Sequence, residues 1–296
     1  MKAIIPAAGQ GTRFLPASKA VPKEMLPVLD KPAIQYVVEE ALAAEASEVI
    51  IICNDDKPEI AAHFLPSPKL EESLDGKGKK ELAQKVRDAG ALPVSFAEQS
   101  QPLGLGHAVY CASKLVSDDP EGFYVLLGDV LVPDNELLGR MRAVSREHDD
   151  ASVIAVMSVP LEDVSRFGII DANLISGSQE EGTAVWKINA LVEKPPVEEA
   201  PSNLAIFGRY LLTPAVMDIL AHTAKGAGGE IQLTDALAEL LQSEEMYAIE
   251  VGAKEGFDCG TIADWLSTNM ILASRDAELS KVVDEVYAKI LGVTSK

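Results

Sequence analysis

Residues 2–31 read KAIIPAAGQGTRFLPASKAVPKEMLPVLDK, and they are the most informative stretch of the chain. Its apolar start, residues 2–8, is typical of a buried β-strand. The strand runs directly into a loop that contains Gly9 and Gly11, and Arg13, Lys19 and Lys23 follow. Glycines let a backbone come close to a ligand, and free amides in such a loop can bind phosphate oxygens. The pattern predicts a nucleotide-phosphate loop at the end of the first strand.

Two common kinds of phosphate loop are excluded by the details of this one. A dinucleotide-binding loop requires a third glycine where Phe14 stands, and a P-loop requires GxxxxGK followed by Ser or Thr. The pattern that remains is Gly9-x-Gly11-Thr12-Arg13, with Lys23 ten residues past the arginine. A tight strand-to-helix turn with surface cations would give the same pattern. Three prolines that stiffen the connection favour the phosphate loop, namely Pro16, Pro22 and Pro27.

The 296 residues alternate between strand-like and helix-like segments. This alternation predicts an α/β fold with a Rossmann-like mixed, mostly parallel central sheet flanked by helices. We expect one domain over residues 1–296, with a first half of about 1–150, a β-rich half of about 151–260 and C-terminal helices over about 261–296.

The expected elements follow from the spacing of apolar residues. Strands are predicted over 2–7, 49–53, 93–97, 123–127, 152–159, 168–171, 184–192 and 204–212. Helices are predicted over 33–44, 104–113, 134–147, 214–220, 232–241 and from 262 onward. Turn signals lie at 173–182 and 195–201. The charged stretch 66–90 predicts an exposed insertion of two short helices, with a flexible loop as the alternative over 73–79.

The net charge of −20 argues against nucleic acid or an anionic membrane as a partner, because both bind basic surfaces. No apolar stretch is long enough to span a bilayer and no secretion signal opens the chain, so we expect a cytoplasmic protein. Residues 1–31 reverse the balance, since five basic residues against two acidic ones give a net charge of +3. An acidic protein that binds a nucleotide must concentrate its cations where the phosphates lie.

The cysteines and histidines do not form a recognisable site. Cys53, Cys111 and Cys259 are odd in number and scattered, which argues against a disulfide framework or a zinc site. Cys53 and Cys111 are expected in the core. The four histidines form no ligand pair, and His107, just inside a predicted helix, is expected to be structural.

Two acidic positions at strand ends are candidates for chemistry. Asp129 follows a buried strand, and ligands of open α/β sheets bind at the carboxyl ends of strands. An aspartate there can hold Mg²⁺, although Gly128-Asp129 is equally a common turn pair. Glu193-Lys194 ends another strand; it could bind sugar hydroxyls and a phosphate, or form an exposed salt bridge before a turn.

The chain resembles the sugar-1-phosphate nucleotidyltransferase family, and within it the group that acts on UTP and glucose 1-phosphate. The opening GxGTR and PKEMLPVLDKPAIQY carry the resemblance first. Further blocks follow in order: Glu98-Gln99 with GLGHAV at 104–109, GDV at 128–130, FGII at 167–170, VEKP at 192–195, APSNLAIFGRYLL at 200–212, GGEIQLTDAL at 228–237 and DCG at 258–260. Each block is weak alone, but the ordered set spans nearly the whole chain and is specific.

The resemblance implies a nucleotide-diphospho-sugar transferase fold with a nucleotide-binding first half and a sugar-binding second half. It implies Mg²⁺-dependent conversion of UTP and glucose 1-phosphate into UDP-glucose and pyrophosphate. The implied catalytic residues are Arg13, Lys23 and Lys194, and the implied metal ligands are Asp129 and Asp258. The implied nucleotide site comprises Ala8, Gly9, Gly11, Glu24, Gln99, Gly104 and Asp129, and the implied sugar site Gly168, Glu193, Lys194 and Gly208. Gln99 would read uracil with one amide donor and one acceptor.

Some features are left open by the resemblance. The family usually has threonine where Cys259 stands, although the UTP-using group resembles this chain there. Glu230 either closes the sugar side of the site or serves helix initiation. The family implies a homodimer or homotetramer, formed through the terminal helices.

Two other functions are consistent with the sequence. The nearer one is transfer from dTTP, or to another sugar 1-phosphate, because a 2′-hydroxyl or a base methyl group is a small target. The farther one is a non-catalytic nucleotide-sugar sensor on the same fold. Such a sensor could lack the charged set, but all five of its members are present: Arg13, Lys23, Asp129, Lys194 and Asp258.

Overall fold

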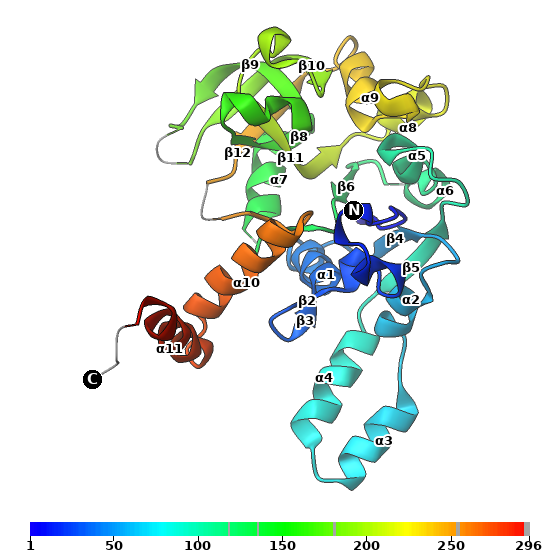
Figure 1. Cartoon of the computed structure of the whole chain (residues 1–296). Helices are drawn as coiled ribbons and strands as arrows, with labels where there is room; N and C mark the ends of the chain where they lie inside the picture. Colours follow the sequence, from blue (N-terminus) through cyan, green and yellow to red (C-terminus); the bar gives the residue numbers. More distant parts are fainter. Residues whose placement is uncertain (118, 135, 180–181, 253–254, 293–296) are drawn as a thin grey trace.

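The computed structural model describes residues 1–117, 119–134, 136–179, 182–252 and 255–292 (Figure 1). Residues 180–181 of the predicted turn and residues 293–296 of the predicted C-terminal helices lie outside this part. The described chain is built around a nine-stranded sheet in the order β5-β4-β1-β6-β11-β8-β12-β10-β9. These strands are β1 (Lys2–Pro6), β4 (Val49–Cys53), β5 (Val94–Glu98), β6 (Phe123–Leu126), β8 (Ser152–Ser158), β9 (Gly168–Ser176), β10 (Val185–Glu193), β11 (Leu204–Leu212) and β12 (Met246–Glu250).

The predicted α/β architecture with a mixed sheet is confirmed, but the described sheet is not mostly parallel: antiparallel pairings make up as much of it as parallel ones. Strands β5, β4, β1 and β6 pair in parallel, and so do β8 and β12. The pairings of β11 with its neighbours, and those of β10 with β12 and β9, are antiparallel. The strands that the first half, residues 1–150, contributes to the sheet are therefore all parallel, as the βαβ alternation predicts, while those of the second half are mixed.

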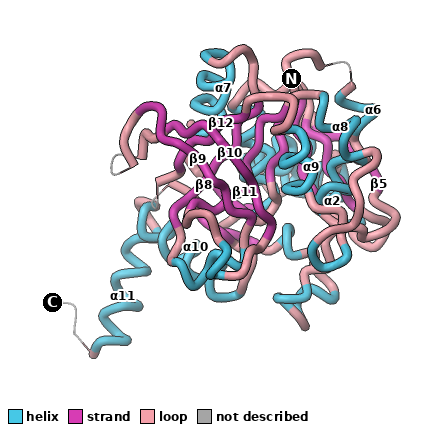
Figure 2. Tube along the Cα trace, turned by 90° about the horizontal axis from the view of Figure 1, so that it is seen from above, coloured by secondary structure: helices cyan, strands magenta, loops and turns pink. Residues whose placement is uncertain are grey.

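Both faces of the sheet are covered, because successive residues of its strands point to opposite sides. Ile5 and Ile51 belong to one core cluster, whereas Ile4 and Ile50 belong to the other. Helices α1 (Ala33–Ala43), α2 (Pro58–Phe64) and α7 (Leu137–Glu147) contribute to the first cluster. Helices α5 (Leu105–Tyr110), α6 (Ser113–Val116), α8 (Ala215–Leu220) and α9 (Leu233–Leu240) contribute to the second. Figure 2 shows these helices around the strands.

Two short ladders and six 3₁₀ segments lie in the described connections between these elements. Strands β2 (Pro27–Val28) and β3 (Lys31–Pro32) form one ladder, and β7 (Val130–Leu131) and β13 (Phe257–Asp258) form the other. The 3₁₀ turns are η1 (Thr12–Phe14), η2 (Ala17–Lys19), η3 (Lys23–Met25), η4 (Leu161–Arg166), η5 (Val197–Glu199) and η6 (Ala227–Gly229).

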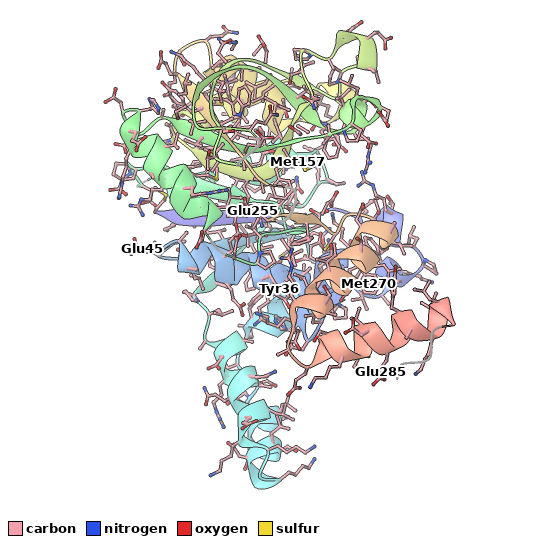
Figure 3. The ribbon with its side chains drawn as sticks, turned by 90° about the vertical axis from the view of Figure 1, so that its left-hand side faces the viewer. Tyr36, Glu45, Met157, Glu255, Met270 and Glu285 are labelled. Carbon is pink, nitrogen blue, oxygen red and sulfur yellow. The ribbon has the colours of Figure 1, made fainter. Side chains whose placement is uncertain are left out.

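The insertion at 66–90 forms two short helices, as predicted. Helices α3 (Pro68–Gly76) and α4 (Lys80–Gly90) form a hairpin that projects away from the sheet (Figures 1 and 3). The hairpin leaves and rejoins the body at one place. A β-carbon added to Gly90 would lie 3.0 Å from the α-carbon of Pro66, so the two ends of the insertion touch.

The C-terminal helices α10 (Ile262–Arg275) and α11 (Leu279–Leu291) extend from the side of the molecule, as Figure 3 shows around Met270 and Glu285. Thr261 caps α10, because its hydroxyl accepts from the amide of Asp264 at 3.2 Å. The two helices pack on each other and leave large apolar side chains in contact with solvent. Among these are Leu266, Met270, Val282, Val286, Tyr287 and Ile290.

Some sequence expectations differ from the structure. Strand β9 continues to Ser176, into the predicted turn region, and helix α7 begins at Leu137 rather than at 134. Strand β12 was not anticipated, because all five of its residues are buried and no alternation marks so short a run. Cys53 and Cys111 are half-buried rather than in the core, whereas Cys259 is buried.

Candidate active site

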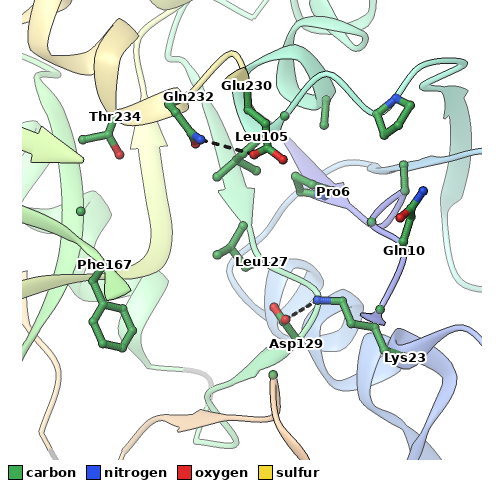
Figure 4. A pocket seen from close by; sticks show the side chains of 18 of the residues that line it. Pro6, Gln10, Lys23, Leu105, Leu127, Asp129, Phe167, Glu230, Gln232 and Thr234 are labelled. Atoms are coloured by element: carbon green, nitrogen blue, oxygen red, sulfur yellow. Dashed lines mark hydrogen bonds and ion pairs between the residues drawn. The ribbon is translucent and has the colours of Figure 1, made fainter. Parts of the chain in front are cut away.

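A cavity of about 650 Å³ lies where the two halves of the chain meet (Figure 4). Twelve of the predicted site residues line it: Ala8, Gly9, Gly11, Arg13, Lys23, Glu24, Gln99, Gly104, Asp129, Gly168, Glu193 and Lys194. They come from sequence positions almost two hundred residues apart. The fold therefore brings the predicted nucleotide residues and the predicted sugar residues into one space.

The sheet topology explains this convergence. Parallel strands β1, β5 and β6 end at the same edge of the sheet, so the residues that follow them are neighbours. Strand β11 runs antiparallel to β6 and extends past its carboxyl end, where Ala205 pairs with Ile169 of β9. The adjoining pair is Gly168 and Glu193, at the start of β9 and the end of β10. The sugar-side residues thus lie beyond the end of β6.

The glycine loop has the conformation that its sequence requires. Gly11 has φ +63°, a left-handed backbone that suits glycine, and its carbonyl accepts a hydrogen bond of 2.8 Å from Ser18 Oγ. A β-carbon at Gly9 would meet nothing within 4 Å, so the backbone there is open to a ligand. Residues 12–25 then fold as three consecutive 3₁₀ turns, and the third places Lys23 at the cavity.

Of the five basic residues in 1–31, only Arg13 and Lys23 line the cavity. Lys2 instead pairs with Glu48 at 3.1 Å, and Lys31 pairs with Glu39 at 2.5 Å. The excess of positive charge in residues 1–31 is therefore only partly located at the cavity.

Lys23 forms an ion pair with Asp129, drawn as a dashed line in Figure 4. Burial disfavours the ammonium, but the Asp129 carboxylate outweighs it and raises the pKa of Lys23 above its ordinary value. Burial alone would likewise raise the pKa of Asp129, and the Lys23 charge holds it below its ordinary value instead. Both groups are therefore charged at neutral pH.

Asp258 lies beside Asp129 because β7 and β13 pair. Val130 is opposite Asp258 in this ladder, and the amide of Cys259 donates to the carbonyl of Asp129 at 2.7 Å. A β-carbon placed on Gly260 would lie 2.8 Å from Asp258 Oδ1, 3.4 Å from Asp129 Oδ2 and 3.4 Å from Arg13 Nη1. Two carboxylates and one guanidinium thus surround the same point.

This pair of carboxylates fits a magnesium ion. Mg²⁺ is bound through one or two carboxylates together with phosphate oxygens and water, and a third protein ligand is not required. Burial, and after it the neighbouring Asp129 charge, raise the pKa of Asp258. The two carboxylates repel each other, and a cation bound between them would offset this repulsion. Within the described residues, no group of three or more His, Cys, Asp and Glu side chains could hold a metal.

Glu24 lines the cavity but is only 2 % exposed. Lys57, at the start of α2, donates to its carboxylate at 2.9 Å and to the carbonyl of Ala7 at 2.5 Å. Burial raises the pKa of Glu24 in spite of this lysine. Lys57 thereby ties Glu24 to the backbone immediately before Ala8, a contact that the sequence did not indicate.

The predicted base-reading residue, Gln99, is 4 % exposed and is held in place by its own amide. Its Nε2 donates to the carbonyl of Gly104 at 3.1 Å and to Nδ1 of His107 at 2.9 Å. His107 therefore has a specific structural role, because its Nδ1 accepts a hydrogen bond from the side chain of Gln99. Because both amide hydrogens are engaged, Gln99 presents its carbonyl oxygen as an acceptor, rather than one donor and one acceptor.

Gly104 must be glycine for the loop after Gln99 to pack on residue 231. Its φ is +114°, and a β-carbon there would lie 2.6 Å from the carbonyl of Ile231. The amide of Ile231 in turn donates to the carbonyl of Leu103 at 2.7 Å. The block GGEIQLTDAL thus packs directly on the loop that follows Gln99.

Among the residues predicted to bind the sugar, Glu193 has both carboxylate oxygens in polar contacts. Lys194 Nζ lies 2.9 Å from Oε1, and the hydroxyl of Thr234 donates to Oε2 at 2.6 Å. Lys194 has φ +47°, which is uncommon for a side chain of this size, and its ammonium end is half-exposed at the cavity. A β-carbon at Gly168 would lie 3.0 Å from Thr234 Oγ1 and 3.1 Å from Glu193 Oε2, so only glycine leaves this contact intact.

The structure adds lining residues that sequence reasoning missed. Gln232 and Thr234 reach the cavity at the start of α9, and Glu230, which the sequence left open between the site and helix initiation, lines it too. Gln232 Nε2 donates to Glu230 Oε2 at 3.3 Å, the contact drawn as a dashed line in Figure 4. Arg166 and Phe167 line it as well. The ordered block at 228–237 was the available signal, but its chemistry depends on contacts distant in sequence.

Gly208 and Asp258 are the two predicted site residues that are not among those lining the cavity. Gly208 lies behind it, since a β-carbon there would be 2.7 Å from Leu127, whose side chain does face the cavity. Gly208 therefore permits the packing of a lining residue, and its contact with a sugar stays a prediction.

Residues 2–275 match the model of a protein family described as nucleotidyl transferase. The chain belongs to this family. It is similar to the UTP–glucose-1-phosphate uridylyltransferase of Bacillus subtilis (strain 168), with 45 % identity over 279 residues that cover 94 % of this chain and 92 % of the relative. A relative with "UTP–glucose-1-phosphate uridylyltransferase 2" as its name, from Staphylococcus saprophyticus, is 42 % identical over 98 % of this chain and 97 % of its own length. The resemblance inferred from the ordered blocks is confirmed.

Solved structures agree with this family assignment. The UTP-bound UGPase from Acinetobacter baumannii is 38 % identical to this chain. Its TM-score is 0.85, over 97 % of this chain and 98 % of that one. A UDP-glucose pyrophosphorylase complexed with UDP-glucose is 35 % identical, with a TM-score of 0.79 over 93 % and 99 % of the two chains. Among the described residues, no helix combines the length and apolarity needed to cross a bilayer.

Proposed function

We propose that this chain transfers the uridylyl group of UTP to glucose 1-phosphate, giving UDP-glucose and pyrophosphate. The observation that carries the proposal is the joint position of three sets of groups in one cavity. These are the buried amide of Gln99 for a base, the cations Arg13 and Lys23 beside Asp129, and the Glu193–Lys194 pair of a carboxylate and a lysine. The names of the relatives, which cover nearly the whole chain, support the same substrates.

The base is recognised on its Watson–Crick edge. The carbonyl oxygen of Gln99 accepts from the ring N–H of uracil, and backbone amides near Ala8 and Gly9 donate to a uracil carbonyl. Thymine presents the same edge, so this contact selects a pyrimidine with that edge and does not separate UTP from dTTP.

Transfer proceeds by in-line attack of a sugar-phosphate oxygen on the α-phosphorus of UTP, without a covalent enzyme intermediate. Lys194 orients the attacking phosphate, and Arg13 and Lys23 bind the triphosphate and stabilise the departing pyrophosphate. Asp129 and Asp258 would hold Mg²⁺, which offsets negative charge on phosphate oxygens when it is bound. The chain's contribution is therefore positioning and charge, on the Rossmann-like parallel half of the sheet.

The sugar is held from the second half of the chain. Glu193 accepts hydrogen bonds from two adjacent hydroxyls, since each of its oxygens has a second lone pair beyond those used by Lys194 and Thr234. The absence of a side chain at Gly168 leaves the sugar room beside this carboxylate.

The chain is proposed to act as a homo-oligomer that assembles through α10 and α11. The exposed apolar side chains of these helices support this, because soluble monomers rarely leave so many together in solvent.

Pyrophosphate release over a panel of nucleotides and sugar 1-phosphates, with and without Mg²⁺, tests the function. We expect turnover with UTP and glucose 1-phosphate that requires Mg²⁺. Faster turnover with dTTP would instead indicate a thymidylyltransferase, and release with another sugar 1-phosphate would reassign the sugar. Absence of release with every pair, despite UTP binding, would favour a sensor on this fold.

A further inference from the structure

A buried ion pair lies directly behind the loop that carries Asp129. Arg209, in the middle of β11, is 0 % exposed. Its Nε and Nη2 donate to the two carboxylate oxygens of Glu40 on α1, at 2.9 and 2.7 Å. Glu40 is likewise 0 % exposed. Neither charge reaches the cavity, so the pair does not contact a substrate.

The remaining donors of Arg209 hold the loop on both sides of Asp129. Nη1 donates to the carbonyl of Leu127 at 3.1 Å, and Nη2 donates to the carbonyl of Val130 at 2.7 Å. The amide of Leu127 is bound from the same strand, by the carbonyl of Gly208 at 2.9 Å. The backbone that carries Asp129 is therefore fixed at both of its ends.

The same guanidinium also bears on Asp258. Val130, whose carbonyl Arg209 binds, is opposite Asp258 in the β7–β13 ladder. The amide of Cys259 closes the ladder on the carbonyl of Asp129. One side chain thus anchors the backbone from which Asp129 projects, and the strand that carries Asp258 is paired with that backbone.

Stability is a weak reason to keep such a pair. Removing two charges from water costs about as much as their attraction returns, and apolar replacements of a buried pair are often neutral or stabilising. A guanidinium that bonds two carbonyls and a carboxylate at once does, however, fix geometry, because its donors form a rigid fork.

We infer that Arg209, braced by Glu40, is a positioning residue that sets the separation and direction of Asp129 and Asp258. The inference deepens the proposed function, on which the catalytic part of its test rests. Displacing a reacting or charge-stabilising group by about 1 Å costs on the order of a hundredfold in rate. Loss of the clamp should therefore lower kcat by about a hundredfold while the fold persists.

The test compares wild type with the double variant Arg209→Met/Glu40→Leu, which fills the same space and leaves no unpaired charge. Arg209→Lys is the second variant, since it retains the charge but not the fork. The matched control is Arg142→Met, which removes the ion pairs of a partly buried arginine on α7 with Glu121 and Glu45, and Arg142 does not line the cavity. Thermal unfolding checks that each variant is folded.

The decisive readout is amide hydrogen exchange of the ligand-free protein, followed by mass spectrometry. Exchange should accelerate at 127–131 and 257–260 in the double variant and in Arg209→Lys, and remain at the wild-type rate in the core strands β1 and β4. The kcat for UTP and glucose 1-phosphate should fall about a hundredfold in the double variant and less in Arg209→Lys, with the KM for glucose 1-phosphate little changed. Arg142→Met should change neither.

Three results would overturn the inference. One is a folded double variant with wild-type exchange in both segments. Another is a uniform increase in exchange with a lower Tm, which would make the pair a stability element only. The third is normal kcat despite faster local exchange. If the double variant does not fold, Arg209→Lys alone decides by the same criteria. Because exchange needs no substrate, it judges the clamp even if the wild-type chain shows no transfer, an outcome that would contradict only the proposed function.

Discussion

Lys194 shows how a single residue joins backbone geometry to chemistry. Its left-handed φ of +47° follows the end of β10, and its amide donates to the carbonyl of Phe167 at 3.0 Å. A residue of this type rarely holds such a conformation, and sparsely populated backbone states concentrate at functional sites. The turn places a compact positive charge beside Glu193 at the cavity.

We expect Lys194→Ala to lower kcat/KM for transfer by about 10²–10³, because one charge-stabilising donor typically contributes that much. Steady-state pyrophosphate release measures this. The control is Lys187→Ala, at a lysine in β10, the strand that precedes Lys194. It removes an exposed ion pair with Glu245 and should leave the rate within about twofold. A folded Lys194→Ala protein with near-normal turnover would remove Lys194 from the mechanism.

The residues that sequence reasoning found share a property that is local. Gln99 and Asp129 follow the ends of β5 and β6, and Glu193 is the last residue of β10. The carboxyl ends of strands are where ligands bind in sheets of this class. Thr234 and Glu40 could not be found this way, since each looks like an ordinary helix residue until its partner is known. Arg209 did leave a signal. A charged residue inside the apolar run LAIFGRYLL must have buried partners.

At the scale of elements, α1 and α2 meet at a histidine. His63, near the end of α2, donates from Nε2 to Gln35 Oε1 on α1 at 2.8 Å, at the edge of a second cavity beneath the α3–α4 hairpin. Burial lowers the pKa of His63 below its ordinary value of 6.5. The folded chain therefore takes up a proton at this position less readily than the unfolded chain does.

Stability should consequently fall as the pH drops from above 6.5 towards the lowered pKa in the folded state. Thermal unfolding between pH 7.5 and 5.5 measures the effect, and His63→Gln should lose less Tm over this range than wild type. His222→Gln, at an exposed histidine that pairs with Glu239, is the control and should follow wild type. Equal slopes for wild type and His63→Gln would contradict the coupling.

The elements that the sequence predicted well are those with a clear period. Strand β1, helix α1 and the α3–α4 insertion lie where their patterns placed them. Strand β12 lacks a pattern because it is enclosed on both faces, and the length of β9 depends on its partner β10, with which it pairs from Gly168 to Ser176. Pairing between distant segments cannot be seen in a single local window.

For the whole molecule, the exposed apolar side chains of α10 and α11 predict association of copies. Ile290 is 73 % exposed and Val286 is 47 % exposed, although both are large and apolar. Val286→Glu and Ile290→Glu should each shift the molar mass found by light scattering towards that of a single chain. Leu70→Glu, the same kind of change at an exposed leucine on α3, should leave the mass unchanged. A wild-type protein that already has the mass of one chain would contradict this assembly.

The α3–α4 hairpin has its two ends in contact, since Gly90 lies against Pro66. A segment that departs and returns at a single point can change in length without altering the path of the polypeptide on either side. The chain enters the hairpin after Pro66 and leaves it at Gly90, and these two positions are adjacent in space. This makes the hairpin a natural place for evolution to lengthen or trim the protein, and for an experimenter to graft a reporter while the cavity chemistry continues undisturbed.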